Sequence, residues 1–359
     1  MFVQPDRTTG GLLAKKLNQP MKINLFVRVI QSILNRHTRL VLLFAALLLA
    51  SAGGVRADET TTNAPPANAG ASAKSEKPPP LPLHQIEGNG GIFSTLSAYL
   101  VNPPRNGEPV GRPAVGFAFV DLGHGQDLEA LTLTETPLSR LELGYGFENF
   151  NLGNLPLAVY RATGLNLSET SVELHNFNAR LQILKEGEFD QKWIPALTFG
   201  VHYKYNDSYD DINNQLKGTL NAIGVSQNDG VDFTLYASKL FTQLPRPVLV
   251  ELGGRATEGV WNGLLGFTDS YNFVFEGNIV VFVTDSIALA AEYRQQPTDY
   301  KTVAVGGQSL IGKAGDWWTI DAAYVVNKHL TLAVGYGHFG TVLNNEANGV
   351  WGITTKWEF

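Results

Sequence analysis

Charged side chains occupy alternate positions in several otherwise apolar segments of this sequence. They are Arg140, Glu142, Glu148, Arg180, Lys204, Asp232, Glu251, Arg255, Glu276, Glu292, Arg294, Asp321, Lys356 and Glu358. Eight of them are acidic and six are basic. Charges away from bulk water are tolerated only when they are hydrated or paired. The near balance is compatible with an ion-pair network that fills an interior, or with a narrow water-filled pore of weak cation preference.

Two spacings within this set predict a cluster. Glu292 and Arg294 lie two residues apart on one face of an extended segment, and Glu276 faces them across a tight turn. Glu251 and Arg255 lie four residues apart on the polar face of the preceding hairpin. The predicted lumen charge cluster consists of Arg140, Glu142, Lys204, Glu251, Arg255, Glu276, Glu292 and Arg294. Such a cluster either fixes strand register or selects ions.

Catalytic and metal-binding patterns are absent from the sequence. There is no G-x-S-x-G, no H-E-x-x-H and no cysteine, and the oxygen-rich stretch 206–214 lacks the Gly and distal Glu of a calcium loop. We therefore predict no catalytic, cofactor-binding or metal-ligating residue, and no cofactor. His202 and His338 are the candidates to test if the protein modifies lipids.

Strands must position the charged side chains, because the apolar residues beside them recur with period two rather than 3.6. The alternation is clear in 140–148, 194–205, 271–283, 286–294 and 330–336. No convincing amphipathic helix follows residue 81. Short and long connections alternate between these segments, as the periplasmic turns and extracellular loops of a membrane barrel do.

The carboxyl-terminal stretch 349–359 alternates most regularly. Trp351, Ile353, Trp357 and Phe359 share one face, which would leave an unpaired apolar edge unless the strand closed a barrel against the first strand. A terminal Phe preceded by alternate aromatics also resembles the assembly signature of bacterial outer-membrane proteins. That resemblance implies recognition of these four residues by the barrel-assembly machinery.

Composition is compatible with this fold class. The formal net charge of −6 argues against a nucleic-acid partner. The mean hydropathy of −0.05 is too low for a helical membrane protein but is typical of strands that alternate lipid-facing and lumen-facing residues. We predict an all-β, antiparallel up-and-down transmembrane barrel of 12 strands, with 10 or 14 as alternatives. The early strands are ambiguous; the candidates are Leu81–Glu87, Ile92–Val101 and Ala114–Leu122.

The amino-terminal part divides into two further segments. Residues 1–57 combine basic residues, the short apolar run 40–50 and small residues, which predicts a signal peptide cleaved after Ala52 or Ala57. Translation starts at Met1 or at Met21. Residues 58–80 are rich in Pro, Ala and Thr, which predicts a disordered periplasmic linker. The barrel is expected to occupy 81–359.

Several stretches together resemble an uncharacterised outer-membrane β-barrel family of Gram-negative bacteria, catalogued as a domain of unknown function. They are I-E-G-N-G-G at 86–91, S-R-L-E-L-G-Y at 139–145, W-I-P-A-L-T-F-G-V-H-Y-K at 193–204, D-F-T-L-Y-A-S-K-L-F at 232–241, R-A-T-E-G-V-W-N-G-L-L-G-F at 255–267, A-E-Y-R-Q-Q-P at 291–297, D-W-W at 316–318 and N-K-H-L-T-L-A-V-G-Y at 327–336. The resemblance covers 86–359. It implies the barrel fold and the outer membrane, and it brings no activity.

Three functions remain compatible with the sequence. The first is a porin-like passive channel for small solutes or ions. The second is a structural or surface-binding barrel with a filled lumen, and the third is an enzyme that modifies outer-membrane lipid. In each case we expect outer-membrane lipid, lipopolysaccharide and the assembly machinery as partners. Whether the lumen is open decides between the first two.

Overall fold

The computed structural model describes residues 83–105 and 107–359. The predicted signal peptide and the linker at 58–80 lie outside the described residues. Among the residues that are described, no helix is long and apolar enough to cross a membrane.

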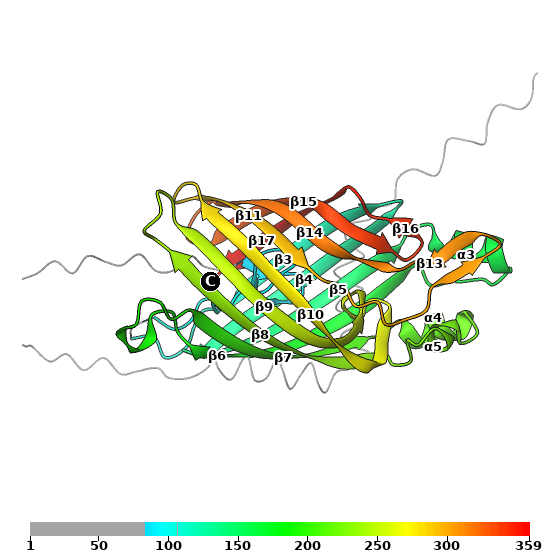
Figure 1. Cartoon of the computed structure of the whole chain (residues 1–359), viewed down its shortest axis with the longest axis horizontal. Coiled ribbons are helices and arrows are strands. Elements are labelled where there is room, and N and C mark those ends of the chain that lie inside the picture. Colours follow the sequence, from blue (N-terminus) through cyan, green and yellow to red (C-terminus); the bar gives the residue numbers. More distant parts are fainter. Residues whose placement is uncertain (1–82, 106) are drawn as a thin grey trace, which may run out of the picture. The chain divides into compact units, whose positions relative to one another are not determined.

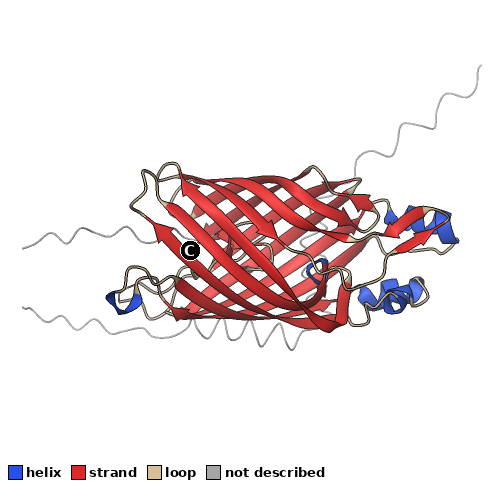
Figure 2. Cartoon of the chain, in the orientation of Figure 1, coloured by secondary structure: helices blue, strands red, loops and turns tan. Residues whose placement is uncertain are grey.

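Twelve antiparallel strands form a closed barrel, which confirms the predicted fold class and strand number (Figures 1 and 2). Each strand pairs with its neighbours in chain order. The strands of the wall are β3 (Ala114–Gly123), β4 (Gln126–Leu138), β5 (Leu141–Leu152), β6 (Ser171–Leu184), β7 (Ala196–Asn206), β8 (Asp229–Phe241), β9 (Val248–Val260), β10 (Gly266–Phe282), β11 (Ile287–Arg294), β14 (Ala314–Val325), β15 (Leu330–Val342) and β17 (Val350–Glu358).

The last strand closes the barrel. β17 pairs with β15 on one side and with β3 on the other, in a register that runs from Trp351↔Asp121 to Glu358↔Ala114. The backbone N–H of Phe359 donates to the carbonyl of Pro113 at 3.2 Å, beyond the end of that ladder. The terminal strand therefore has no unpaired edge, as its alternation predicted.

The outer face of the wall is apolar. Exposed side chains on it include Phe117 of β3, Leu235 of β8, Ile279 of β10, Ile320 of β14 and Ile353 of β17. Residues at the alternate positions point inward and are mostly buried and polar. A closed barrel with an apolar exterior satisfies every backbone group of the wall within lipid. The molecule is thus built as an outer-membrane barrel.

The two ends of the barrel differ. Five connections between wall strands, together with residues 114 and 358, lie at one end, which we call the turn end. At the other end, the loop end, the connections carry most of the remaining elements (Figure 1). These are α3 (Leu155–Thr163), α4 (Tyr209–Gln215), α5 (Thr219–Ala222), the 3-10 helix η2 (Trp261–Gly263), β12 (Val303–Val305), β13 (Gln308–Ile311) and β16 (Asn345–Glu346). A second 3-10 helix, η1 (Glu188–Asp190), lies in a turn-end connection.

One expectation about connections needs correction. Short helices do follow residue 81, and they were missed because helices of four to nine residues are too short for a 3.6-residue period to emerge. The β3–β4 connection at the loop end is a tight turn. His124 and Gly125 adopt φ of 56° and 76° there, and the glycine makes this conformation inexpensive.

Residues 83–101 lie inside the barrel, and we call this segment the plug. It contains the short hairpin β1 (Leu83–Gln85) and β2 (Asn89–Gly91), whose strands pair only with each other. The expectation that Leu81–Glu87 or Ile92–Val101 forms a wall strand is therefore wrong. Every residue of the plug is buried, although no strand ladder connects it to the wall.

Candidate functional site: the plugged lumen

Carboxylates of the wall bind backbone N–H groups of the plug. Glu292 accepts from the N–H groups of Phe93, Ser94 and Thr95, at 3.1, 3.1 and 2.7 Å. The Thr95 hydroxyl donates to the same carboxylate at 2.5 Å. Glu142 accepts from the N–H of Gly90 at 3.2 Å and from that of Val101 at 2.7 Å. Plug amides that would pair in a strand are satisfied instead by inward-pointing side chains.

Donors of the wall bind the plug carbonyls in the same way. Arg180 donates from Nη1 to Gly90 at 3.0 Å and from Nη2 to the carbonyl of Ser97, while its ion pair with Glu142 measures 2.7 Å. Further donors come from β4, β6 and β7. They are Thr134 to Gly88 at 3.0 Å, Thr136 to Val101, Asn178 to Glu87 at 2.6 Å, Gln182 to Ala98 at 2.9 Å and Thr198 to Ala98 at 2.6 Å. The plug is thus held by side chains from many strands.

A buried ion-pair network ties the plug to the centre of the lumen. Glu87 of the plug faces Arg255 at 2.9 Å, Arg294 at 3.2 Å and Lys204 at 3.3 Å. These three cations also meet two wall carboxylates. The contacts are Asp232 to Lys204 at 2.9 Å and to Arg255 at 2.8 Å, and Glu276 to Arg255 at 2.8 Å and to Arg294 at 3.3 Å. Three carboxylates therefore balance three cations, and one of the carboxylates belongs to the plug.

Other lumen carboxylates have no cationic partner among the described residues. Glu251 accepts hydroxyl hydrogen bonds from Ser97 and, at 2.7 Å, from Ser238. Glu148 accepts from Asn176 at 2.9 Å, and Asp321 lies 2.8 Å from the Thr319 hydroxyl. Within the described part of the chain, one oxygen of each of these three carboxylates lacks a hydrogen-bond partner. The lumen consequently contains more carboxyl groups than cationic groups.

Seven of the eight residues in the predicted charge cluster point into the lumen. Lys204, Arg255, Glu276 and Arg294 join the central network, whereas Glu142, Glu251 and Glu292 bind plug groups. Arg140 does not belong to this cluster, because it lies in the β4–β5 turn and donates to Glu188 and to the carbonyl of Ile183. Its hydrogen bond keeps the pKa of Glu188 below the ordinary value.

Sequence reasoning missed Glu87, the acidic residue on which the network converges. It lies in the stretch I-E-G-N-G-G, and those glycines were a usable signal, because they allow the plug backbone to approach the wall closely. A Cβ on Gly144 of β5 would lie 2.0 Å from the carbonyl oxygen of Gly88. A Cβ on Gly146 would lie 2.5 Å from the carbonyl oxygen of Glu87. Any larger residue at these two wall positions would displace the plug.

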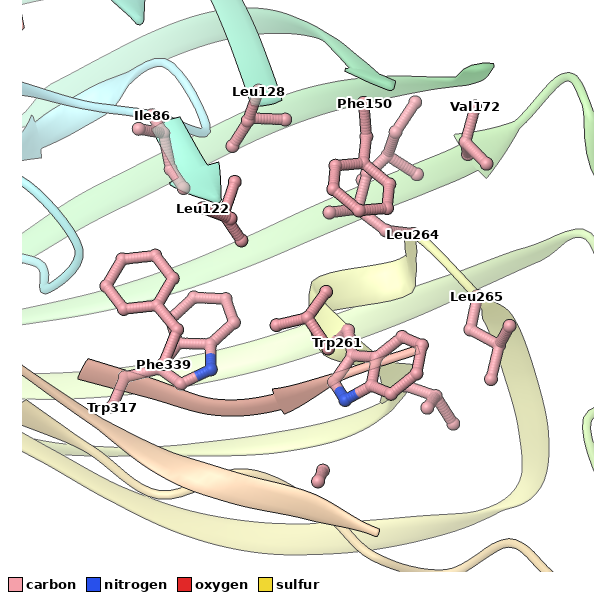
Figure 3. Close-up of a cluster of buried hydrophobic side chains, with 14 of the residues drawn as sticks. Ile86, Leu122, Leu128, Phe150, Val172, Trp261, Leu264, Leu265, Trp317 and Phe339 are labelled. Carbon is pink, nitrogen blue, oxygen red and sulfur yellow. The ribbon is translucent and has the colours of Figure 1, made fainter. Parts of the chain in front are cut away.

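The loop end is closed by apolar side chains. Phe150, Trp261, Leu264 and Leu265 gather there with residues of α4 and α5, and the space left among them measures only about 30 Å³ (Figure 3). Trp317 and Phe339 stack nearby with ring centroids 4.6 Å apart. A solute that entered from this end would have to displace a packed apolar layer.

The turn end contains a larger cavity, which we call the vestibule. Its volume is about 300 Å³. Plug residues Leu83, Ile92, Ser97 and Tyr99 form one side of it, and β9, β10, β11 and β14 form much of the other. The vestibule extends inward as far as Glu251. The lumen is thus hollow on the turn-end side of the plug and filled on the loop-end side.

The two candidate histidines do not form a common site. His202 is fully buried, and its ring lies 2.7 Å from Asn178 Oδ1 and 2.9 Å from Thr234 Oγ1. His338 stacks against Trp318 with ring centroids 6.4 Å apart. In residues 83–105 and 107–359, no group of three or more His, Asp or Glu side chains could hold a metal ion.

Known proteins resemble this chain in fold. A family model described as "Protein of unknown function (DUF3034)" matches residues 117–354. The KdgM porin is 10% identical over 68% of this chain and 99% of its own, with a TM-score of 0.41. The COG4313 outer membrane channel from Pseudomonas putida F1 is 12% identical over 70% of this chain and 96% of its own, with a TM-score of 0.39. Outer membrane phospholipase A from Escherichia coli is 10% identical over 69% and 98%, with a TM-score of 0.34. No curated protein matches the sequence.

Proposed function

We propose that this chain, which belongs to the DUF3034 family of unknown function, is a porin-like passive channel for small solutes or ions that residues 83–101 close at rest. The single observation that carries the proposal is the way in which the plug is bound. Wall strands are joined by ladders of backbone hydrogen bonds, but the plug is joined to the wall by side chains alone. It can therefore leave without breaking any backbone hydrogen bond of the barrel wall.

The lumen that remains would be hydrophilic. Four charged side chains point inward, namely Glu142, Arg180, Glu276 and Glu292. Water can hydrate them once the plug has moved, so the lumen tolerates these charges without the plug. A barrel of twelve strands lies between those that pack solid and those that leave an aqueous channel, so occlusion by an additional segment is physically reasonable. The excess of carboxylates favours cations.

The second candidate is a structural barrel whose lumen is permanently filled. The observation in its favour is Glu87, which faces three buried cations. Removing one partner from such a network costs about 3–5 kcal/mol. If nothing outside the protein compensates that cost, the plug stays in place and nothing passes.

Orientation and partners follow from the same proposal. The turn end would face the periplasm, which would place the vestibule and the plug entrance on that side. Lipid surrounds the apolar outer face. We keep lipopolysaccharide and the barrel-assembly machinery as proposed partners, the latter through Trp351, Ile353, Trp357 and Phe359.

A reversible lock on the plug tests the channel. A Cβ built on Gly116 of β3 lies 3.1 Å from the Cβ of His84, close to the separation of about 3.5–4.5 Å that a disulfide requires. Because the chain has no cysteine, the double variant His84→Cys/Gly116→Cys would contain a single possible disulfide. The plug is already joined to β3 at its other end, so this bond would retain it at both ends.

In planar bilayers, the unmodified protein should give discrete conductance steps, and the oxidised double variant should give none. Reduction should restore the steps, and the two single-cysteine variants should conduct in both states. Steps that persist in the fully oxidised variant would refute gating by the plug. An unmodified protein that stays silent through many insertions would support the filled barrel.

A further inference from the structure

Part of the vestibule wall is apolar, although the inward-facing side chains of a membrane barrel are usually polar. In the sheet register, Leu249 of β9, Val280 of β10 and Ala290 of β11 lie side by side and point inward. One step closer to the turn end, Phe282, Ala288 and Ala323 form a second such row. Since Ile279, Val281 and Leu289 cover the outer face of these strands, this part of the barrel is apolar on both faces.

Much of the rest of the lumen wall at this end is polar. Lys356 and Glu358 of β17 form an ion pair of 2.6 Å, and Gln182 and Thr198 bind the plug. A passage for water and ions needs no aliphatic surface, and such a surface costs free energy when water covers it. The apolar rows, together with Ile92 and Tyr99 of the plug, would suit a ligand with a hydrocarbon part.

Two carboxylates border these rows. Asp321 continues the row of Leu249, Val280 and Ala290, because it pairs with Ala290 in the sheet register. Glu251 pairs with Asn278, one step further inward. Both carboxylates line the vestibule and are at least 96% buried, and each has an oxygen without a hydrogen-bond partner. A buried acceptor of this kind is costly unless a donor reaches it.

We propose that the vestibule binds a small molecule that combines a hydrocarbon body with a protonated amine. The body would contact the rows of Leu249 and Phe282, and the ammonium group would donate to Asp321 and Glu251. A volume of about 300 Å³ lies at the lower end of the range for small-molecule pockets. This inference goes beyond the proposed conduction, since binding requires no open passage.

Three probes of similar size separate charge from hydrophobicity. They are 2-phenylethylammonium, neutral 2-phenylethanol and anionic 3-phenylpropionate. The full-length protein, reconstituted in lipid nanodiscs, would carry one environment-sensitive fluorophore on Asn327→Cys at the vestibule rim, the only cysteine in the chain. A fluorescence change that saturates with probe concentration would report binding to the protein. Uptake of the probes by empty nanodiscs would measure how much of each probe partitions into lipid.

Binding should be saturable and strongest for the ammonium probe. Asp321→Asn should weaken the ammonium probe about tenfold, the effect of losing one charge-assisted hydrogen bond, and should leave the alcohol unchanged. This variant is decisive because Asp321 bonds to Thr319 of the wall rather than to the plug. Ala290→Phe should abolish binding of all three probes by filling the cavity, and native gel migration would confirm that the barrel has folded.

Three results would overturn the proposal. The first is an equal response to the ammonium and the carboxylate probe. The second is an unchanged response in Ala290→Phe, which would assign the signal to lipid. The third is an ammonium affinity that Asp321→Asn and Glu251→Gln both leave intact. A protein that is silent in bilayers but binds the ammonium probe would refute the channel and support the binding site.

Discussion

Glu87 and Arg255 are separated by 168 residues in the sequence, and Oε2 of the first lies 2.9 Å from Nη1 of the second. The contact joins the plug to β9 at the centre of the barrel. Arg255 also bonds to Asp232 and Glu276 at 2.8 Å each, so the arginine keeps carboxylate partners when the plug leaves. Glu87 would lose all three of its cations unless water replaces them. The ion pairs among wall residues therefore do not require the plug, and the plug adds Glu87 as a further carboxylate.

Replacing Glu87 should loosen the plug. Glu87→Gln preserves the side-chain shape but leaves three buried cations facing two carboxylates, a change expected to cost about 3–5 kcal/mol of plug binding. Single-channel recordings should show a higher open fraction than in the unmodified protein. Glu108→Gln is the matched control, because Glu108 pairs with Arg112 on the surface and such a pair contributes at most about 1 kcal/mol. Equal open fractions in both variants would contradict a role for the network in closure.

Steric displacement of the plug should have the same effect without changing any charge. Gly144→Ala and Gly146→Ala each place a Cβ within 2.5 Å of a plug carbonyl oxygen. Both should raise the open fraction and make a cysteine introduced at Ser94 accessible to water-soluble thiol reagents. Gly349→Ala is the control, since the nearest atom to its Cβ would be 3.7 Å away. If Ser94→Cys stays protected in both glycine variants, the plug is more adaptable than its contacts indicate.

Conduction should favour cations. The buried lumen and plug residues include nine carboxyl groups, namely Glu87, Glu142, Glu148, Asp232, Glu251, Glu276, Glu292, Asp321 and Glu358, but five cations, namely Arg180, Lys204, Arg255, Arg294 and Lys356. Reversal potentials in a KCl gradient should report a preference for potassium. Glu148→Gln should shift the permeability ratio toward one. Glu129→Gln, on the outer face of β4, should not shift it. An anion preference would exclude lumen charge as the selectivity determinant.

Removing the terminal residue should impair assembly more than stability. Phe359 is exposed at the turn end, and its side chain adds little to a folded barrel whose β3–β17 ladder ends at residue 358. Deletion of Phe359 should lower the amount of protein in the outer membrane much more than it lowers the melting temperature of purified barrels. Phe189→Ala removes another exposed aromatic from the same end and serves as the control. Equal membrane yields would exclude Phe359 as an assembly signal.

The barrel wall could be predicted from the sequence because its pattern is local. Leu141, Phe199 and Ile353 each belong to a period-two run that specifies which face meets lipid. The terminal strand predicted closure because pairing with the first strand removes its unpaired apolar edge. Strand number was harder, since 83–101 also contains apolar residues at intervals compatible with strands.

The plug could not be predicted from such patterns because its contacts are long-range. Glu87 contacts Arg294 across 207 residues of sequence, and no spacing encodes that distance. Its backbone amides are satisfied by side chains of strands that lie far along the chain. The vestibule did leave a local signal. Ile279-Val280-Val281-Phe282 is apolar at every position, which an ordinary lumen-facing strand would not be.

Residues 102–113 connect the plug directly to β3, and this covalent link sets how the plug returns. A random-coil chain of twelve residues spans about 20 Å on average, so a released plug stays near its binding groups at an effective concentration on the order of millimolar. Closure is then an intramolecular event whose rate does not depend on how much protein the membrane contains. A free peptide with the sequence of 83–101 would have to approach that same concentration before it could compete with the tethered segment.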